Sequence, residues 1–413
     1  IHGGGLNYTL SSKDYKHRFN AYTSLQNIAR ESYYGAGRDT NAYGQTKDFT
    51  VVGGAQYSYD FDKFLFMPSM LTAGVEFSHN KLNDKMLGYN REINQEVNVY
   101  SVYLQNEWKT ARFSFLLGGR LDKNSHVDDP IFSPRLNIRY NPITDLSFRA
   151  SYSEGFRAPQ TYDEDLHVDA VGGALKLIVL APDLKPEYSN SFSLSADLYH
   201  NFGRVQTNLL IEGFYTKLDD VFTLVQIGED ADGNFIMERR NASGATVKGF
   251  NFEGKIGIPN LFELQLGYTL QSSLYDRPFE WAENSDLPAQ RKMFRTPDSY
   301  GYFTSTWNIA PRFRASLFGT YTGTMLVQHT FYNAQTDSTQ DAETLTPDFF
   351  DMGLKLAYTF RLSTSVNLEL SAGVKNIFNS YQKDLDFGPL KDAGYVYGPA
   401  LPRMFFAGLK LTM

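Results

Sequence analysis

A short acidic segment offers the first candidate chemistry in the sequence. It groups one tyrosine, three carboxylates and one histidine: Tyr162, Asp163, Glu164, Asp165 and His167. Carboxylate oxygens bind divalent cations, and a neutral imidazole can ligate iron directly. The spacing fits no defined metal site, so two interpretations stay open. The segment contacts a metal ion or a metal-bearing ligand, or it is a solvated loop.

A second polar cluster has the pattern of the first part of a calcium loop. Asp230, Asp232 and Asn234 place oxygen atoms at alternate positions around Gly233. A calcium loop of this kind also needs a glutamate at its last ligand position, and none follows here. The alternative is a tight hairpin turn at the Asp-Gly pair. Ca²⁺ in an outer loop therefore stays a hypothesis, and we expect no other intrinsic cofactor.

Motifs for catalysis are missing from the sequence. It contains no GxSxG, HExxH or Walker sequence, and it has no cysteine that could serve as a nucleophile. Ser, His and Asp residues that converge from separate loops would escape such a search. We nevertheless expect a protein that is not an enzyme.

The composition narrows the class of protein. Aromatic residues make up 15% of the 413 residues, with 27 Tyr and 32 Phe, which suits membrane barrels with aromatic girdles at both interfaces. No apolar run reaches the roughly 18 residues that a membrane-spanning helix needs, so a helical membrane protein is excluded. The net charge of -7 without a basic stripe argues against nucleic acid as a partner.

Strands with one apolar and one polar face recur along the chain. At its end, Phe405, Ala407 and Leu409 form an apolar stripe opposite residues of mixed polarity. By the same alternation we assign some side chains to a lipid face, namely Leu194, Leu209 and Leu266, and others to the interior, namely Ser195, Asn208 and Gln265. About seventeen such strands have the length that crosses a bilayer when tilted. The predicted fold is an all-β, transmembrane antiparallel β-barrel.

The connections between these strands alternate between tight turns and long loops. The tight turns are expected at 109–111, 141–145, 201–203, 258–260, 309–311 and 361–363. The long loops are expected at 123–131, 153–187, 219–244, 273–298, 323–346 and 375–402. Outer-membrane barrels show this asymmetry, with short periplasmic turns and longer outer loops.

Six motifs in order resemble those of TonB-dependent outer-membrane receptors. They are Ser133-Pro134-Arg135, the box Gly155-Phe156-Arg157-Ala158-Pro159, Leu184-Lys185-Pro186-Glu187, the strand with Lys248-Gly249-Phe250 and Glu253, the segment Val374-Lys375-Asn376-Ile377-Phe378-Asn379, and the terminal strand. The resemblance implies a barrel of 22 strands, filled by an N-terminal plug domain, in the outer membrane of a Gram-negative bacterium.

Measured against that family, the sequence is expected to be one β-barrel domain over 1–413 that lacks the plug, the TonB box and about five leading strands. It begins at Ile1 without a secretory signal, which we expect to have been removed or to lie outside this sequence.

The resemblance also implies a function. It predicts active import of a scarce metal chelate, such as a ferric siderophore, haem or cobalamin, driven by the TonB complex through the absent N-terminal part. The predicted partners include outer-membrane lipid and, in one alternative, a surface lipoprotein. That alternative is an importer of glycans of the SusC-like type, and another is a passive porin or adhesin barrel.

Site residues follow from the same resemblance. The acidic segment with Tyr162, Asp163, Glu164, Asp165 and His167 would approach the ligand from the outer side. In haem receptors of this family, a histidine lies between the box that corresponds to Gly155–Pro159 and a following NP(D/N)L box. His167 occupies that interval here, although Ala181 replaces the Asn of the second box. The interior arginines would face the plug or form ion pairs in the lumen, and they are Arg135, Arg139, Arg149 and Arg157.

Overall fold

The computed structural model describes residues 1–33, 42–166, 169–171, 174–282 and 287–412. Their regular secondary structure is β-strand apart from one helical turn, α1 (Asp163–Leu166), and one 3-10 turn, η1 (Leu87–Tyr89). Among the described residues, no helix is long and apolar enough to cross a membrane.

One large sheet forms the body of the molecule, and it contains eighteen strands in the described residues. The strand β17 (Gln290–Lys292) has only three residues, so the other seventeen match the number predicted from the alternation. These are β1 (His2–Ser11), β2 (His17–Tyr33), β3 (Tyr43–Phe64), β4 (Met67–Met86), β5 (Arg91–Lys109), β6 (Phe113–Asn124), β7 (Ile131–Ile143), β8 (Leu146–Arg157), β11 (Glu187–Phe202), β12 (Val205–Asp219), β15 (Ala245–Ile258), β16 (Phe262–Phe279), β18 (Ser299–Ala310), β19 (Phe313–Thr322), β22 (Phe349–Arg361), β23 (Asn367–Lys375) and β24 (Met404–Thr412).

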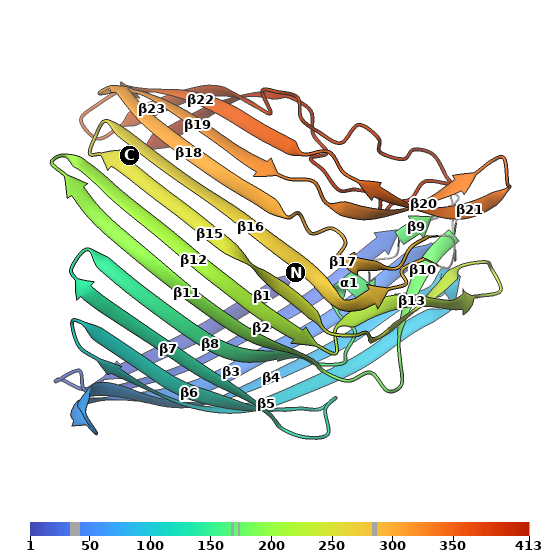
Figure 1. Cartoon of the computed structure of the whole chain (residues 1–413), viewed down its shortest axis with the longest axis horizontal. Helices are drawn as coiled ribbons and strands as arrows, with labels where there is room; N and C mark the ends of the chain where they lie inside the picture. The colour runs from blue at the N-terminus through green and yellow to red at the C-terminus, as the bar shows by residue number, and fades with distance from the viewer. Residues whose placement is uncertain (34–41, 167–168, 172–173, 283–286, 413) are drawn as a thin grey trace.

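Each long strand pairs with the next in antiparallel fashion, from β1 to β24. The sheet curves round so that its two halves face each other across the molecule (Figure 1). Neighbouring strands joined by hairpins keep most pairings local along the chain.

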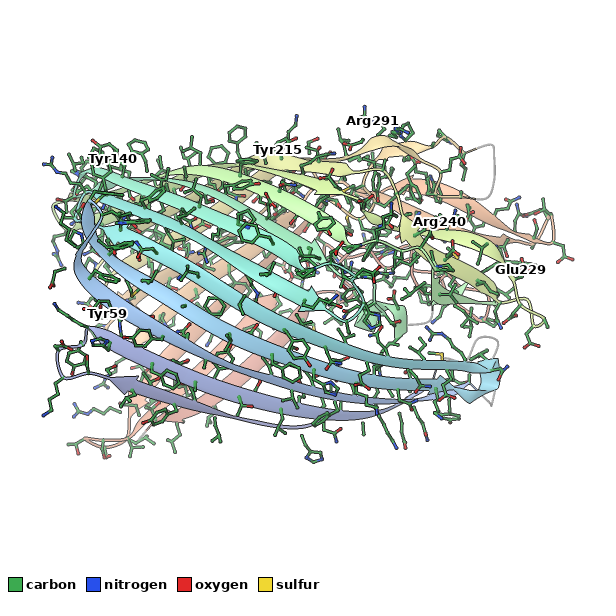
Figure 2. The ribbon with its side chains drawn as sticks, turned by 90° about the horizontal axis from the view of Figure 1, so that it is seen from below. Tyr59, Tyr140, Tyr215, Glu229, Arg240 and Arg291 are labelled. Carbon is green, nitrogen blue, oxygen red and sulfur yellow. The ribbon has the colours of Figure 1, made fainter. Side chains whose placement is uncertain are left out.

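The two rims of this wall differ as the sequence predicts. β7 and β8 are joined at one rim by the tight turn after Ile143, and the 158–186 connection leaves β8 at the opposite rim. Tyr59 and Tyr140 lie at the tight-turn rim, and Glu229 and Arg240 lie at the long-loop rim (Figure 2). On that side β4 and β5 run on to η1, so the wall extends further there than the alternation alone indicated.

Side chains divide between the two faces of the wall. Leu194 and Leu209 point outward, with exposed fractions of 64% and 47%. On the other face Asp197 is buried, where its Oδ2 lies 3.2 Å from Arg149 Nη1 and its Oδ1 accepts a hydrogen bond of 2.6 Å from Asn208 Nδ2. An outward apolar face and an inward polar face are what a membrane barrel requires. The face assignments made from the sequence are thus confirmed in this part of the wall.

Aromatic side chains gather at the tight-turn rim. The Trp108 Nε1 donates a 2.9 Å hydrogen bond to the carbonyl oxygen of Phe64, and its ring stacks 5.4 Å from that of Phe66. Further round the wall, Trp307 packs 4.2 Å from Phe262. An apolar ring with a polar tip is favoured at the level of lipid headgroups, as expected of a girdle.

The long-loop rim carries structure of its own, which corrects the prediction of loops there. A four-stranded sheet consists of β13 (Phe222–Glu229), β14 (Phe235–Asn241), β10 (Ala174–Leu180) and β9 (Asp169–Val171). A separate hairpin consists of β20 (Leu326–Asn333) and β21 (Ser338–Leu345). β10 and β14 belong to different connections yet pair in parallel, over five register positions. Two long connections are thereby joined in one sheet.

Candidate functional site at the long-loop rim

The acidic segment folds into the single helical turn α1. The Asp165 Oδ2 accepts a 2.8 Å hydrogen bond from the backbone N–H of Tyr162, and the Tyr162 carbonyl accepts one of 2.9 Å from the Asp165 N–H. His167 lies outside the described residues, and the side chains of Asp163 and Glu164 are likewise outside them. Their predicted contact with a ligand therefore stays a prediction.

Asp165 belongs to a buried ionic network. Its carboxylate forms an ion pair with Arg239 on β14, and the two side chains are only 1% and 7% exposed. The Asp165 carbonyl also accepts a 2.9 Å hydrogen bond from Arg91 Nη2 on β5. Buried charges are tolerated only when they are paired and hydrogen-bonded. Asp165 thus anchors the segment to the barrel wall through β5 and to the four-stranded rim sheet through β14.

Arg157, the arginine of the Gly155–Pro159 box, supports the same segment through its ring contacts. Its guanidinium carbon lies 3.9 Å from the centre of the Tyr162 ring and 5.5 Å from that of Phe222 on β13. The Tyr162 hydroxyl donates a 2.7 Å hydrogen bond to the carbonyl of Ala158. Cation–π contacts of this kind stabilise a desolvated arginine. The box therefore ends β8 and fixes the start of the 158–186 connection.

Gln95 docks this connection onto the wall from β5. Its side-chain amide donates to the Thr161 carbonyl at 3.1 Å, and its side-chain oxygen accepts from the Thr161 N–H at 2.7 Å. The paired bonds satisfy the backbone of a loop residue as a neighbouring strand would.

The Asp230 cluster forms the turn between β13 and β14. The Asp230 Oδ1 accepts from the N–H of Asp232 at 2.9 Å and of Asn234 at 2.8 Å, and the Oδ2 accepts from the Asn234 Nδ2 at 2.9 Å. Burial alone would raise the pKa of the Asp230 carboxyl. These hydrogen bonds to the charged form outweigh burial, so the pKa is lowered. Asn234 Oδ1 accepts in turn from the Leu175 N–H at 3.1 Å.

These contacts engage both Asp230 oxygens within the protein, which is the arrangement of an Asx turn. Across the described ranges, no group of three or more His, Asp or Glu side chains is arranged to hold a metal ion. Calcium binding at Asp230, Asp232 and Asn234 stays the untested alternative to this turn.

A second cluster at this rim was not singled out from the sequence. The His329 ring on β20 stacks 3.7 Å from the Tyr395 ring, and its Nε2 lies 2.9 Å from Asp386 Oδ2. The Thr330 N–H donates to Asp392 Oδ2 at 3.0 Å. These contacts hold the 376–403 connection against the β20–β21 hairpin, over a small apolar core of Met325, Val327 and Tyr395. The close spacing of aspartates and tyrosines after position 380 was the available signal.

Asp384 is a further anchor in the same connection. Both Tyr395 and Tyr397 donate hydroxyl hydrogen bonds to its carboxylate, at 3.0 and 2.5 Å. Burial works against the charged form, but these donors outweigh it and hold the pKa of Asp384 below its usual value. The 376–403 connection is therefore ordered by its own side chains.

Comparison with known proteins identifies the family to which this fold belongs. The family described as "TonB dependent receptor-like, beta-barrel" matches residues 2–377. The chain belongs to the TonB-dependent receptor family. Its fold is the all-β antiparallel barrel of that family, as predicted. TonB-dependent receptors are transporters rather than enzymes, which confirms the expectation from the missing catalytic motifs.

Solved structures of TonB-dependent receptors share the fold at low sequence identity. The siderophore receptor PirA from Acinetobacter baumannii aligns with a TM-score of 0.68 at 16% identity, over 99% of this chain and 62% of that protein. A mutant of the ferric enterobactin receptor PfeA from Pseudomonas aeruginosa gives 0.72 at 17%, over 99% and 61%. The ferric-catecholate import receptor Fiu from E. coli K12 gives 0.70 at 13%, over 99% and 63%.

The chain thus spans just over three fifths of the length of these structural neighbours. No curated protein matches the sequence. The organisation predicted for 1–413, a single barrel domain without plug or leading strands, stays a prediction.

The interior arginines of this receptor barrel share one face of β7 and β8. Arg139 and Arg149 are direct cross-strand partners, and Arg135 pairs with Ser153 on the same face. Arg149 reaches Asp197, so lumen ion pairing accounts for it. Arg157 also lies on this face, and its guanidinium contacts the rings of the long-loop rim. Contact of any of the four with a plug stays a prediction.

Proposed function

We propose that this protein imports a ferric siderophore across the outer membrane of a Gram-negative bacterium, with energy delivered by the TonB complex. The family match over residues 2–377 is the observation that carries the proposal. The structural neighbours support the ligand class, because they include a siderophore receptor, ferric enterobactin receptors and a ferric-catecholate import receptor. Haem and cobalamin, both open from the sequence, are the less favoured ligands.

The long-loop rim is the proposed ligand-capture surface. Loops held by a rigid scaffold commonly carry binding residues. Here the described parts of the 158–186, 220–244 and 376–403 connections are held by ion pairs and ring contacts. We place the acidic segment with Tyr162, Asp163, Glu164 and His167 at this surface, with Asp165 as its anchor. An ordered surface loses less conformational entropy on binding than free loops would.

An energy source is needed because a site that binds a scarce ligand tightly must change state to release it. A passive porin would transport without TonB, and a glycan importer would respond to sugars rather than iron. Neither alternative is favoured by the structural neighbours. A surface lipoprotein partner stays a prediction.

Uptake of radioactive iron tests the proposal. Iron-starved cells that lack their other receptors and carry the complete protein should accumulate iron from a ferric catecholate, and the same cells without TonB should not. Uptake that persists without TonB would contradict active import. Uptake of haem or cobalamin without uptake of any ferric siderophore would contradict the proposed ligand class.

The acidic segment can be tested in the same cells. Removing 162–180 should abolish uptake while the barrel remains inserted, because the deletion takes away both α1 and β10. His167→Ala should impair growth on haem alone if haem is the ligand. Wild-type uptake of every chelate, haem and cobalamin after the deletion would exclude this connection from the mechanism.

A further inference from the structure

A groove crosses the outward face of the wall over β11, β12, β15 and β16. It has a volume of about 660 Å³, within the range of about 300 to 1,000 Å³ that is usual for ligand sites. Its outward-facing rings and aliphatic side chains include Phe192, Leu194, Phe250 and Leu270, all at least two fifths exposed. The groove is therefore open and apolar, on the face that the proposed function turns toward lipid.

Gly213 forms the floor of the groove. It pairs with Leu194 on one side and with Phe250 on the other, so it lies on the same outward face. A Cβ at this position would lie 3.3 Å from the Phe250 ring. The Phe250 ring thus lies close over Gly213, and a larger side chain at this position would press against it. We call the apolar part of the groove beside this ring the channel.

One cation stands at the end of the groove nearer the long-loop rim. Lys248 lies on the outward face, opposite Tyr215 in the β12–β15 register and three residues from the start of β15. Tyr215 is seen on the barrel wall in Figure 2. Lys248 is exposed, and within the described residues its ammonium forms no ion pair or hydrogen bond. A lysine on a lipid-facing strand extends toward the headgroup level.

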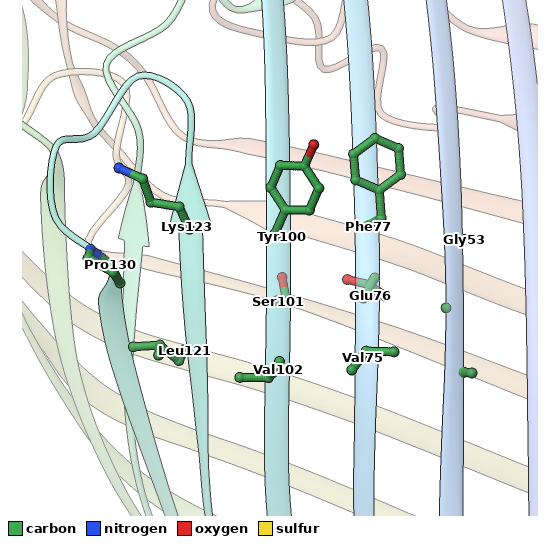
Figure 3. A pocket seen from close by; sticks show the side chains of 12 residues that line it. Gly53, Val75, Glu76, Phe77, Tyr100, Ser101, Val102, Leu121, Lys123 and Pro130 are labelled. Atoms are coloured by element: carbon green, nitrogen blue, oxygen red, sulfur yellow. The ribbon is translucent and has the colours of Figure 1, made fainter.

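Two other lysines differ from Lys248, because their ammonium groups have partners within the protein. Lys217 forms an ion pair with Asp276. Lys123 borders a similar groove of about 580 Å³ beside Phe77 and Tyr100 (Figure 3), but its ammonium donates to the carbonyls of Val127 and Asp128 at 2.6 and 2.7 Å. Lys248 is thus the lysine available to an outside anion among these three.

We propose that this groove binds one lipid carrying an anionic phosphate headgroup, with an acyl chain over Gly213 and the phosphate at Lys248. The apolar channel selects a chain, and the lysine at its outer end selects a negative headgroup. This inference rests on the membrane placement in the proposed function, and it adds a defined lipid site to the barrel wall.

Native mass spectrometry of the complete protein in detergent tests the site. Phosphatidylglycerol and phosphatidylcholine with identical chains are titrated at low ionic strength, where surface charge is least screened. The wild type should prefer phosphatidylglycerol about fivefold, which corresponds to about 1 kcal/mol for one lysine. Lys248→Gln should remove this preference, and the matched control Lys123→Gln should keep it.

A second pair of variants tests the acyl channel. Gly213→Val should weaken binding of both lipids, because the side chain fills the floor. Gly254→Val is the control, since Gly254 is an outward glycine on β15 whose Cβ would meet Leu266 at an ordinary 3.6 Å. Glycerol phosphate, which has no chain, should not bind. Equal preference in wild type and Lys248→Gln, or equal binding by the two valine variants, would overturn the proposal.

Iron uptake measured on the same variants separates the two proposals. Normal TonB-dependent uptake without lipid preference would overturn the lipid site alone. Lipid preference without uptake of any iron chelate would overturn the proposed function and leave the site standing.

Discussion

Replacing the Asp165 carboxylate tests whether the buried ion pair orders the capture surface. Asp165→Asn keeps the size of the side chain but removes its charge, and it leaves the Arg239 guanidinium buried at 7% exposure without this counter-charge. Breaking a buried pair from one side costs about 3 to 5 kcal/mol. This free energy is lost from the docking of the 158–166 segment onto β14, because the barrel strands keep their own hydrogen-bonded pairing. The wall should therefore stay folded.

Hydrogen exchange read by mass spectrometry measures this effect locally. Amides of 158–166 should exchange more than about a hundredfold faster in Asp165→Asn, up to the limit set by free opening, since every 1.4 kcal/mol is a factor of ten. Asp232→Asn is the control, because that aspartate is exposed in the β13–β14 turn. Asp165→Asn with Arg239→Met should regain protection relative to the single variant.

Two results would refute this reasoning. Unchanged exchange in Asp165→Asn would mean that the ion pair contributes nothing to docking. Additive effects in the double variant would mean that Asp165 and Arg239 act independently, whatever their distance.

Three further predictions concern the wall and the rim. Leu194→Arg should cost about 2 to 4 kcal/mol in a folding titration into vesicles if the residue lies near the midplane, and Ser195→Arg should cost far less; equal costs would reverse the two faces. Chelation with EDTA should leave amide protection of 230–234 unchanged, because both Asp230 oxygens already accept hydrogen bonds; a calcium-dependent change would instead favour the metal interpretation. Because folding lowers the pKa of Asp384, its carboxylate stabilises the folded state at every pH above the usual pKa of 3.8. This stabilisation is lost as the pH falls through the lower pKa of the folded state. The 376–403 connection should keep its protection at neutral pH and lose it only in that acid window, and Asp384→Asn should abolish this pH dependence.

The barrel wall could be predicted from the sequence because its signal is local. Leu194 and Ser195 report their opposite faces through period-two alternation, and each tight turn follows within the same hairpin. Seventeen strands repeat that signal, so an error in the predicted end of one strand leaves the predicted topology unchanged.

The ordering of the rim could not be predicted in the same way. Asp165 and Arg239 are 74 positions apart, and nothing near either residue indicates the other. The run Leu175–Leu180 does carry strand character, since Leu175 and Leu177 are buried. The sequence nevertheless predicts a loop here, because Asp, Gly and Pro surround the run. The role of Arg157 also depends on Phe222, which arrives from another connection.

The parallel pairing of β10 with β14 has a consequence for how such a protein could change over generations. Each strand supplies the hydrogen-bonding edge of the other, so a connection transplanted from a relative would meet an edge of the wrong register. Chimeras that exchange 158–186 together with 220–244 should fold, whereas those that exchange either alone should expose an unpaired strand. New binding preferences at this rim are therefore expected to arise by matched change in two distant stretches of the gene.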